Sequence, residues 1–134
     1  MLNISDAEHE ETSPDASRLL ISKLSCSLVG ETQTVNVRPG TLAYQAYGRE
    51  QVVEQFSCNY GLNPAYEEEL EKNGLKITGR GEDGEARIVE LADHPFFIAT
   101  LFVPQLSSSV ERPHPLIIQF LEAAKRFQVT HIRA

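Results

Sequence analysis

The clearest hydrophobic pattern lies near the C-terminal end of the chain. Between residues 115 and 127, apolar side chains recur at steps of three and four, as they do along one face of an α-helix. The residues on this face are Leu116, Ile117, Phe120, Leu121, Ala124 and Phe127. The pattern predicts the last helix of the chain, with one apolar face.

Strand patterns precede this helix. Residues 96–103 are almost continuously apolar, which predicts a strand covered on both faces in an α/β sheet. Residues 75–78 and 86–91 alternate in polarity around a glycine-rich stretch, in which Asp83-Gly84 is a strong turn signal. These two runs therefore predict a β-hairpin.

The first half of the chain predicts further strands. Residues 24–29 and 34–37 flank the sequence Gly30-Glu31-Thr32, which indicates a pair of strands joined by a tight turn. Residues 52–58 indicate another strand.

Two shorter helices are predicted from their capping residues. Residues 41–47 begin with a threonine, a suitable N-cap, and Gly48 is the usual residue just past a helix end. A second helix begins after Asn63 and stops at Gly74. The acidic residues 67–69 suit its N-terminal half, where the helix dipole is positive.

These elements form one domain between a connector and a tail. Residues 1–17 are rich in Asp, Glu, Ser and Thr and predict an exposed acidic connector. Residues 18–127 hold the predicted strands and helices, and residues 128–134 form a tail. A chain of 134 residues is long enough for one domain with a single core.

The negative net charge of the chain disfavours two classes of binding partner. Nineteen acidic against twelve basic side chains give a net charge of −7, which opposes binding to nucleic acid or to anionic lipid. No apolar run approaches the roughly 20 residues that span a bilayer, and the first residues are unlike a signal or transit peptide. We therefore expect a cytoplasmic protein, with neither nucleic acid nor a membrane as partner.

The cysteines and glycines point to no cofactor. Cys26 and Cys58 lie in separate segments, without a Cys-x-x-Cys pair or a histidine at metal-ligand spacing, and predict two reduced thiols. The glycines at 79, 81 and 84 lie in the predicted hairpin and not between a strand and a helix, where a phosphate-binding loop would be. We expect no metal site and no cofactor.

Five short sequence motifs occur in the same order in one enzyme family. They are Tyr60-Gly61-Leu62-Asn63-Pro64, Ile77-Thr78-Gly79 with Asp83-Gly84, Val89-Glu90-Leu91-Ala92-Asp93-His94-Pro95-Phe96-Phe97, Phe102-x-Pro104, and Arg112-Pro113-His114-Pro115-Leu116. Over about residues 6–125 the chain resembles the C-terminal part of the class-I glutamine amidotransferase domain of CTP synthase. It is also similar to small stand-alone proteins related to that region.

The resemblance implies an α/β fold. This would be part of the mixed sheet of a flavodoxin-like three-layer domain, with a β-hairpin and flanking helices. In the family, which belongs to the ligases of pyrimidine biosynthesis, glutamine is attacked by a cysteine on a Gly-x-Cys-x-Gly turn. Residues 7–15 resemble the stretch that follows the helix after this turn, so we expect the nucleophile segment to lie before Met1.

The other two members of the family's catalytic triad are a histidine and a glutamate in the pattern Phe-His-Pro-Glu. The matching residues here are Phe102-Val103-Pro104-Gln105. Val103 cannot accept a proton, and Gln105 cannot stabilise an imidazolium as a carboxylate would. The resemblance therefore implies a pseudoenzyme with no catalytic residues of its own.

Four residues are candidates for contacts with a ligand: Glu11, Cys58, Asn59 and Tyr60. Glu11 matches the family's glutamate that binds the α-amino group of glutamine, and its alternative is a solvated acid in the connector. The family has basic residues before this tyrosine, whereas the chain has Ser57, Cys58 and Asn59. The expected ligand is glutamine or another small molecule.

Three functions remain open at this point. The chain is a fragment of a CTP synthase-like amidotransferase domain, or a non-catalytic ligand-binding or regulatory module with that fold, or an enzyme of new chemistry at Cys58. The third would need His94 or His114, which both suit caps of turns or helix starts. Without the preceding strands of the family fold, the sheet would have an exposed edge and an uncovered apolar face. This predicts self-association or a completing N-terminal segment.

Overall fold

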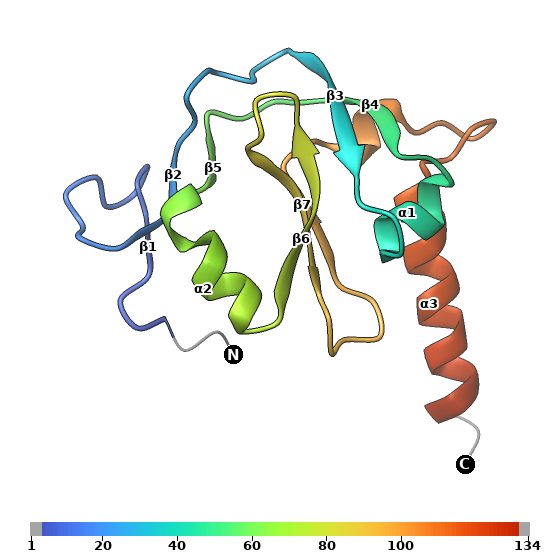
Figure 1. The fold of residues 1–134 in the computed structure, drawn as a ribbon. Helices are drawn as coiled ribbons and strands as arrows, with labels where there is room; N and C mark the ends of the chain where they lie inside the picture. The colour runs from blue at the N-terminus through green and yellow to red at the C-terminus, as the bar shows by residue number, and fades with distance from the viewer. Residues whose placement is uncertain (1–3, 132–134) are drawn as a thin grey trace.

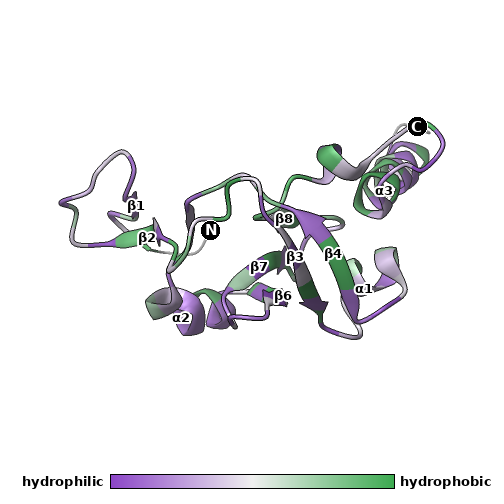
Figure 2. Ribbon diagram, turned by 90° about the horizontal axis from the view of Figure 1, so that it is seen from above, coloured by the Kyte–Doolittle hydropathy of each residue, from purple (hydrophilic) through white to green (hydrophobic). Residues whose placement is uncertain are grey.

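Two β-sheets and three α-helices make up residues 4–131, the part of the chain that the computed structural model describes. The larger sheet has five antiparallel strands in the order β4-β3-β6-β7-β8. Its strands are β3 (Thr32–Val37), β4 (Gln51–Gln55), β6 (Leu75–Gly81), β7 (Ala86–Leu91) and β8 (Ile98–Thr100). Figures 1 and 2 place this sheet between the N-terminal segments and the last helix.

The smaller sheet is mixed, since β1 (Glu8–His9) runs parallel to β2 (Leu19–Lys23), and β2 runs antiparallel to β5 (Tyr60–Leu62). The α-helices are α1 (Leu42–Tyr47), α2 (Glu67–Lys72) and α3 (Pro115–His131), and two 3-10 helices are η1 (Pro64–Tyr66) and η2 (Pro104–Ser107). This arrangement of a mixed sheet, a hairpin and flanking helices confirms the predicted α/β class. No helix among residues 4–131 is long and apolar enough to cross a membrane.

The elements with strong local signals form as predicted. The β6–β7 hairpin turns at Gly84, whose φ of 82° lies in the left-handed region that favours glycine. The Thr41 side chain accepts a hydrogen bond from the N–H of Tyr44, and Gly48 closes α1 with a φ of 68°. Asn63 caps η1, which leads directly into α2.

The predicted pairing of residues 24–29 with residues 34–37 is wrong. Residues 24–29 form no strand, because their backbone is held by the segment before β5 instead. Leu24 N–H donates to Asn59 O at 2.8 Å, and Leu28 N–H donates to Cys58 O at 3.0 Å. The neighbours of β3 are therefore β4 and β6, and the strand predicted over residues 52–58 is confirmed only as β4.

The predicted burial of residues 96–103 is also wrong. The strand within them, β8, is three residues long and lies at the edge of the larger sheet. Ala99 is exposed, and the side chain of Phe97 is 38% exposed. The predicted C-terminal helix is confirmed and continues to His131, but most of its apolar face is open to solvent.

One core lies between the larger sheet and the helices α1 and α3. Its fully buried residues are Leu28, Val35, Val37, Ala43, Val52, Phe56, Ile88, Phe102 and Leu116. The buried Glu90 of β7 fixes α1 against this core. Its carboxylate accepts the N–H of Ala43 at 2.8 Å and the N–H of Leu42 at 3.0 Å. It thereby satisfies two donors that a helix start leaves without an intrahelical partner.

We expect Glu90→Ala to lower the free energy of unfolding by about 1–3 kcal/mol, because two backbone donors lose their charged acceptor in a buried place. Urea denaturation measures the change. The matched control is Glu82→Ala in the exposed hairpin turn, which should stay within about 0.5 kcal/mol of the unsubstituted chain. Equal effects of the two substitutions would contradict the capping role of Glu90.

Candidate functional site

The segment that follows β8 is held rigidly by the end of β4. Phe102 is buried and forms an isolated bridge with Phe56, and the two rings lie edge to face with centroids 5.8 Å apart. Val103 N–H donates to Gln55 O at 3.0 Å. Val103 is the N-cap residue of η2, so the backbone of residues 102–105 is fixed from both sides.

The side chains at the two predicted triad positions differ in exposure. Val103 is half-buried and Gln105 is exposed. A valine side chain has no group that takes up a proton, and a neutral amide carries no charge to balance an imidazolium. Neither side chain can act as a general base.

The predicted ligand residues lie on and around the smaller sheet. Tyr60 opens β5, and its ring centroid is 5.2 Å from that of His9 on β1. The N–H of Glu11 donates to His9 Nδ1 at 3.1 Å. His9 therefore links the loop after β1 to Tyr60, while Glu11 and Asn59 are both exposed.

Cys58 is held in its protonated form. Its thiol donates to Leu101 O at 3.4 Å, and burial raises its pKa against the opposing effects of Arg87 and the Ser57 backbone. A thiol with a raised pKa is a poor nucleophile, because the thiolate is the reactive form. Among residues 4–131, no hydrogen bond joins this thiol to a histidine.

The largest group of buried polar side chains was missed by sequence reasoning. Glu54 and His114 are each 3% exposed, and His114 Nε2 lies 2.8 Å from Glu54 Oε1. Tyr47 donates its hydroxyl to the same oxygen at 2.6 Å. Ser107 donates to the other carboxylate oxygen at 3.3 Å. One carboxylate thus receives hydrogen bonds from α1, from η2 and from the residue before α3.

The tautomer of His114 follows from its neighbours. The N–H of Leu116 donates to His114 Nδ1 at 3.2 Å, so Nδ1 is the acceptor and Nε2 carries the hydrogen toward Glu54. His114 therefore caps the start of α3, as predicted, and also pairs with Glu54. The signal for the pair was the alternation of β4, which places Glu54 on the same inward face as Val52.

A hollow of about 580 Å³ opens beside this network. Its walls include Tyr47, Glu54 and His114, with Arg49 and Arg112 among its exposed residues. Among residues 4–131, no group of three or more His, Cys, Asp and Glu side chains could hold a metal ion.

Burial raises the pKa of Tyr47, and the hydrogen bond to Glu54 and its negative charge raise it further. An unfolded tyrosine ionises near pH 10, whereas Tyr47 in the fold stays neutral there. This contribution to stability is fully present below pH 10 and is lost as the pH rises above it.

We expect the free energy of unfolding to fall above pH 10 by about 1.4 kcal/mol per pH unit from this one proton. Tyr47→Phe should be less stable than the unsubstituted chain at pH 8, because it loses the bond to Glu54. The difference between the two proteins should shrink as the pH rises from 10 to 11. Urea denaturation at each pH measures it, and a constant difference would refute the assigned role of Tyr47.

The comparisons with known proteins point to one family. The chain is 34% identical to the CTP synthase of Cytophaga hutchinsonii over 137 aligned positions, which cover 95% of this chain and 25% of that protein. It is 45% identical to the CTP synthase of Nitratidesulfovibrio vulgaris over 91 positions, which cover 67% of this chain and 16% of that protein. The chain thus spans about a quarter or less of these relatives. No protein-family model matches it.

Among solved structures, the fold matches the glutaminase domain of Trypanosoma brucei CTPS, a structure with bound acivicin. The TM-score is 0.87 at 25% sequence identity, and the match covers 94% of this chain and 53% of that chain.

Proposed function

Since this chain is homologous to the C-terminal glutamine amidotransferase region of CTP synthase, we propose that it is the C-terminal part of a glutaminase-type domain that does not itself hydrolyse glutamine. The fold is that of the glutaminase domain, which is flavodoxin-like. The proposal concerns the chemistry, because the fold can be kept while the reaction is lost.

The observation that carries this proposal is the segment of residues 102–105. The N–H of Val103 donates to Gln55 O, and Val103 is the N-cap residue of η2. The predicted triad positions in this segment nevertheless hold Val103 and Gln105. Hydrolysis of a side-chain amide needs a base that takes a proton from the nucleophile and returns it to the leaving ammonia. Neither residue can do this, and loss of such a base costs about 10²–10⁴ in rate.

The cysteines of the chain offer no replacement nucleophile. Cys26 lies in Leu24-Ser25-Cys26-Ser27-Leu28 and Cys58 precedes Asn59, so neither is on a Gly-x-Cys-x-Gly turn. Burial raises the pKa of Cys58, and its thiol is engaged with the Leu101 carbonyl. New chemistry at Cys58 would therefore need a base that its contacts do not provide.

We expect the purified chain to release no ammonia from glutamine above background, in a coupled glutamate dehydrogenase assay. The double variant Val103→His with Gln105→Glu should also be inactive, because the base pair alone lacks its nucleophile. The CTP synthase of Cytophaga hutchinsonii is the positive control.

Turnover by the unsubstituted chain would overturn the proposal. If that turnover disappeared in Cys58→Ser, the function would be new chemistry at this thiol. If Cys58→Ser left it unchanged, the source would lie elsewhere in the chain.

A retained ligand site is the second candidate function. It is favoured by the contacts of His9, whose ring lies tilted against that of Tyr60 with centroids 5.2 Å apart and which accepts the N–H of Glu11. Two predicted ligand residues are therefore neighbours of one histidine. A carboxylate there suits the ammonium group of an amino acid.

We expect isothermal titration calorimetry with glutamine to detect binding that weakens about tenfold or more in Glu11→Gln, because a charge-assisted hydrogen bond is lost. Glu122→Gln on the exposed face of α3 is the matched control and should bind as the unsubstituted chain does. Equal affinities of the two variants would remove Glu11 from the site.

A further inference from the structure

Two linkers join the smaller sheet to the larger one. Residues 24–31 connect β2 with β3, and residues 56–59 connect β4 with β5. Figure 1 shows these two linkers running alongside each other. The first linker carries Cys26 and the second carries Cys58, and both thiols are free. The fold therefore brings together two cysteines that the sequence places in separate segments.

The backbone contacts between the linkers set the position of Cys26. Leu24 N–H donates to Asn59 O at 2.8 Å, and Leu28 N–H donates to Cys58 O at 3.0 Å. Cys26 is midway between these two anchors along the chain, so its Cα lies within about 7 Å of the Cα of either anchor. A disulfide joins Cα atoms that are about 4.4–6.8 Å apart. Both ends of the loop that carries Cys26 are therefore anchored beside Cys58, and closing a disulfide needs movement of this loop alone.

The loop that carries Cys26 is loosely held. Cys26 forms no hydrogen bond with another residue among residues 4–131, and Ser25 N–H reaches Glu85 Oε1 only at 3.4 Å. Cys26 is exposed, and so are Ser25 and Ser27 on either side of it. The thiol of Cys26 is therefore accessible to a reagent in solution, and its backbone has few contacts that oppose a local shift.

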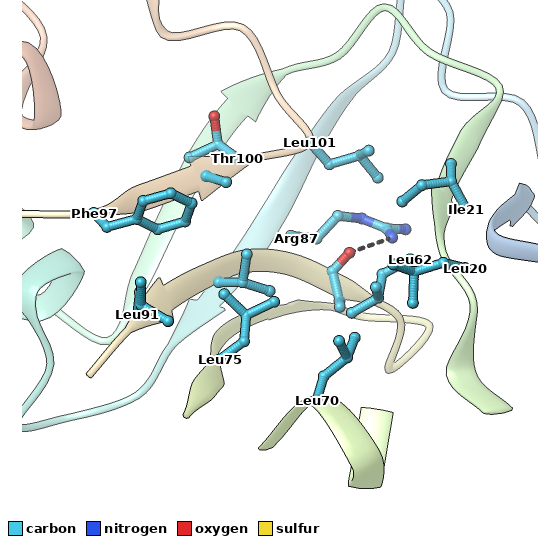
Figure 3. A pocket seen from close by; sticks show the side chains of 13 residues that line it. Leu20, Ile21, Leu62, Leu70, Leu75, Arg87, Leu91, Phe97, Thr100 and Leu101 are labelled. Atoms are coloured by element: carbon cyan, nitrogen blue, oxygen red, sulfur yellow. Dashed lines mark hydrogen bonds between the residues drawn. The ribbon is translucent and has the colours of Figure 1, made fainter. Parts of the chain in front are cut away.

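The thiol of Cys58 has different surroundings. It is half-buried and donates to Leu101 O at 3.4 Å. Burial raises its pKa, and the positive charge of Arg87 opposes this effect. Figure 3 shows the side chain of Arg87 extending between Leu101 and Ile21, which line the same apolar hollow of about 310 Å³. Because the thiolate is the reactive form, Cys26 at the surface reacts first and Cys58 reacts second.

We propose that Cys26 and Cys58 form a thiol–disulfide site, which reacts with a low-molecular-weight disulfide and closes a bond between the two linkers. In the first step, the Cys26 thiolate attacks the small disulfide, whose S–S bond breaks. A mixed disulfide forms on Cys26, and one small thiol leaves. In the second step, Cys58 gives its proton to water and its sulfur attacks that of Cys26, which releases the second small thiol. Two protein thiols are oxidised, and the small disulfide is reduced to two thiols.

This bond fastens the two sheets to each other. Both linkers run between the smaller and the larger sheet, so a bond across them restricts the movement of one sheet against the other. It also removes the thiol proton from Leu101 O, whose own N–H donates to Arg87 O on β7 at 2.9 Å. The site uses neither Val103 nor Gln105, so it does not depend on whether the chain hydrolyses glutamine.

The test is incubation of the purified, reduced chain with oxidised glutathione at pH 8, followed by mass spectrometry of the intact chain and of its peptides. We expect a product that has lost two hydrogen atoms, carries no glutathione and yields one cross-linked peptide pair with Cys26 and Cys58. Cys58→Ser should stop after the first step and keep glutathione on Cys26. Cys26→Ser should react at least tenfold more slowly, because its remaining thiol is half-buried and protonated.

Both variants should keep the fold. Cys26 is exposed, and a serine hydroxyl at position 58 can still donate to Leu101 O. An unsubstituted chain that keeps glutathione on Cys26 without closing the bond would overturn the proposal. So would a disulfide between the Cys26 residues of two copies, or equal reaction rates of the two variants.

Thermal unfolding gives a second measurement. The oxidised chain should have a Tm about 5 °C or more above that of the reduced chain, because the bond restricts the unfolded state. Dithiothreitol should reverse the shift. Cys26→Ser treated with oxidised glutathione in the same way is the matched control and should show no shift. An unchanged or lowered Tm of the oxidised chain would mean that the linkers are not placed for this bond, which refutes the proposal.

Discussion

The fold depends on the buried carboxylate of Glu54, which joins elements far apart in the sequence. Tyr47 of α1 and His114 before α3 both bond to one oxygen, while Ser107 of η2 bonds to the other. A buried carboxylate is costly unless its oxygens are satisfied, so these three donors offset the loss of water. Each donor is placed by its own element, and the carboxylate therefore fixes how α1, η2 and α3 lie on the larger sheet.

This network also supports the backbone of residues 102–105 independently of the side chains at 103 and 105. Within this segment, the N–H of Val103 donates to Gln55 O. The segment continues into η2, in which Ser107 donates to Glu54. Both supports come from β4 and require nothing of the side chains at 103 and 105. The contacts that hold this backbone are therefore separate from the side chains at 103 and 105.

Sequence reasoning succeeded where the signal is local and failed where it depends on distant partners. The caps of α1 and the turn at Gly84 need only neighbouring residues, and both are confirmed. Glu54 and His114 are 60 positions apart, so no local pattern could pair them, although the alternation along β4 marks Glu54 as inward. The predicted pairing of residues 24–29 failed because these residues form no strand, and a local pattern does not show that their N–H groups bond to the segment before β5. The roles of Glu11, Asn59 and Tyr60 stay predictions.

The wrong prediction about β8 carries information of its own. Its nearly continuous apolar run predicts a strand covered on both faces, and the structure shows that strand open on both sides and along its edge. A hydrophobic pattern reflects the surroundings in which a sequence is stable, and exposure of so much apolar surface is unfavourable in water. The helical face of Phe120 and Leu121 shows the same mismatch on the neighbouring element. Two independent patterns thus place apolar side chains at one region of the surface, and both elements leave more apolar area in water than their sequences favour.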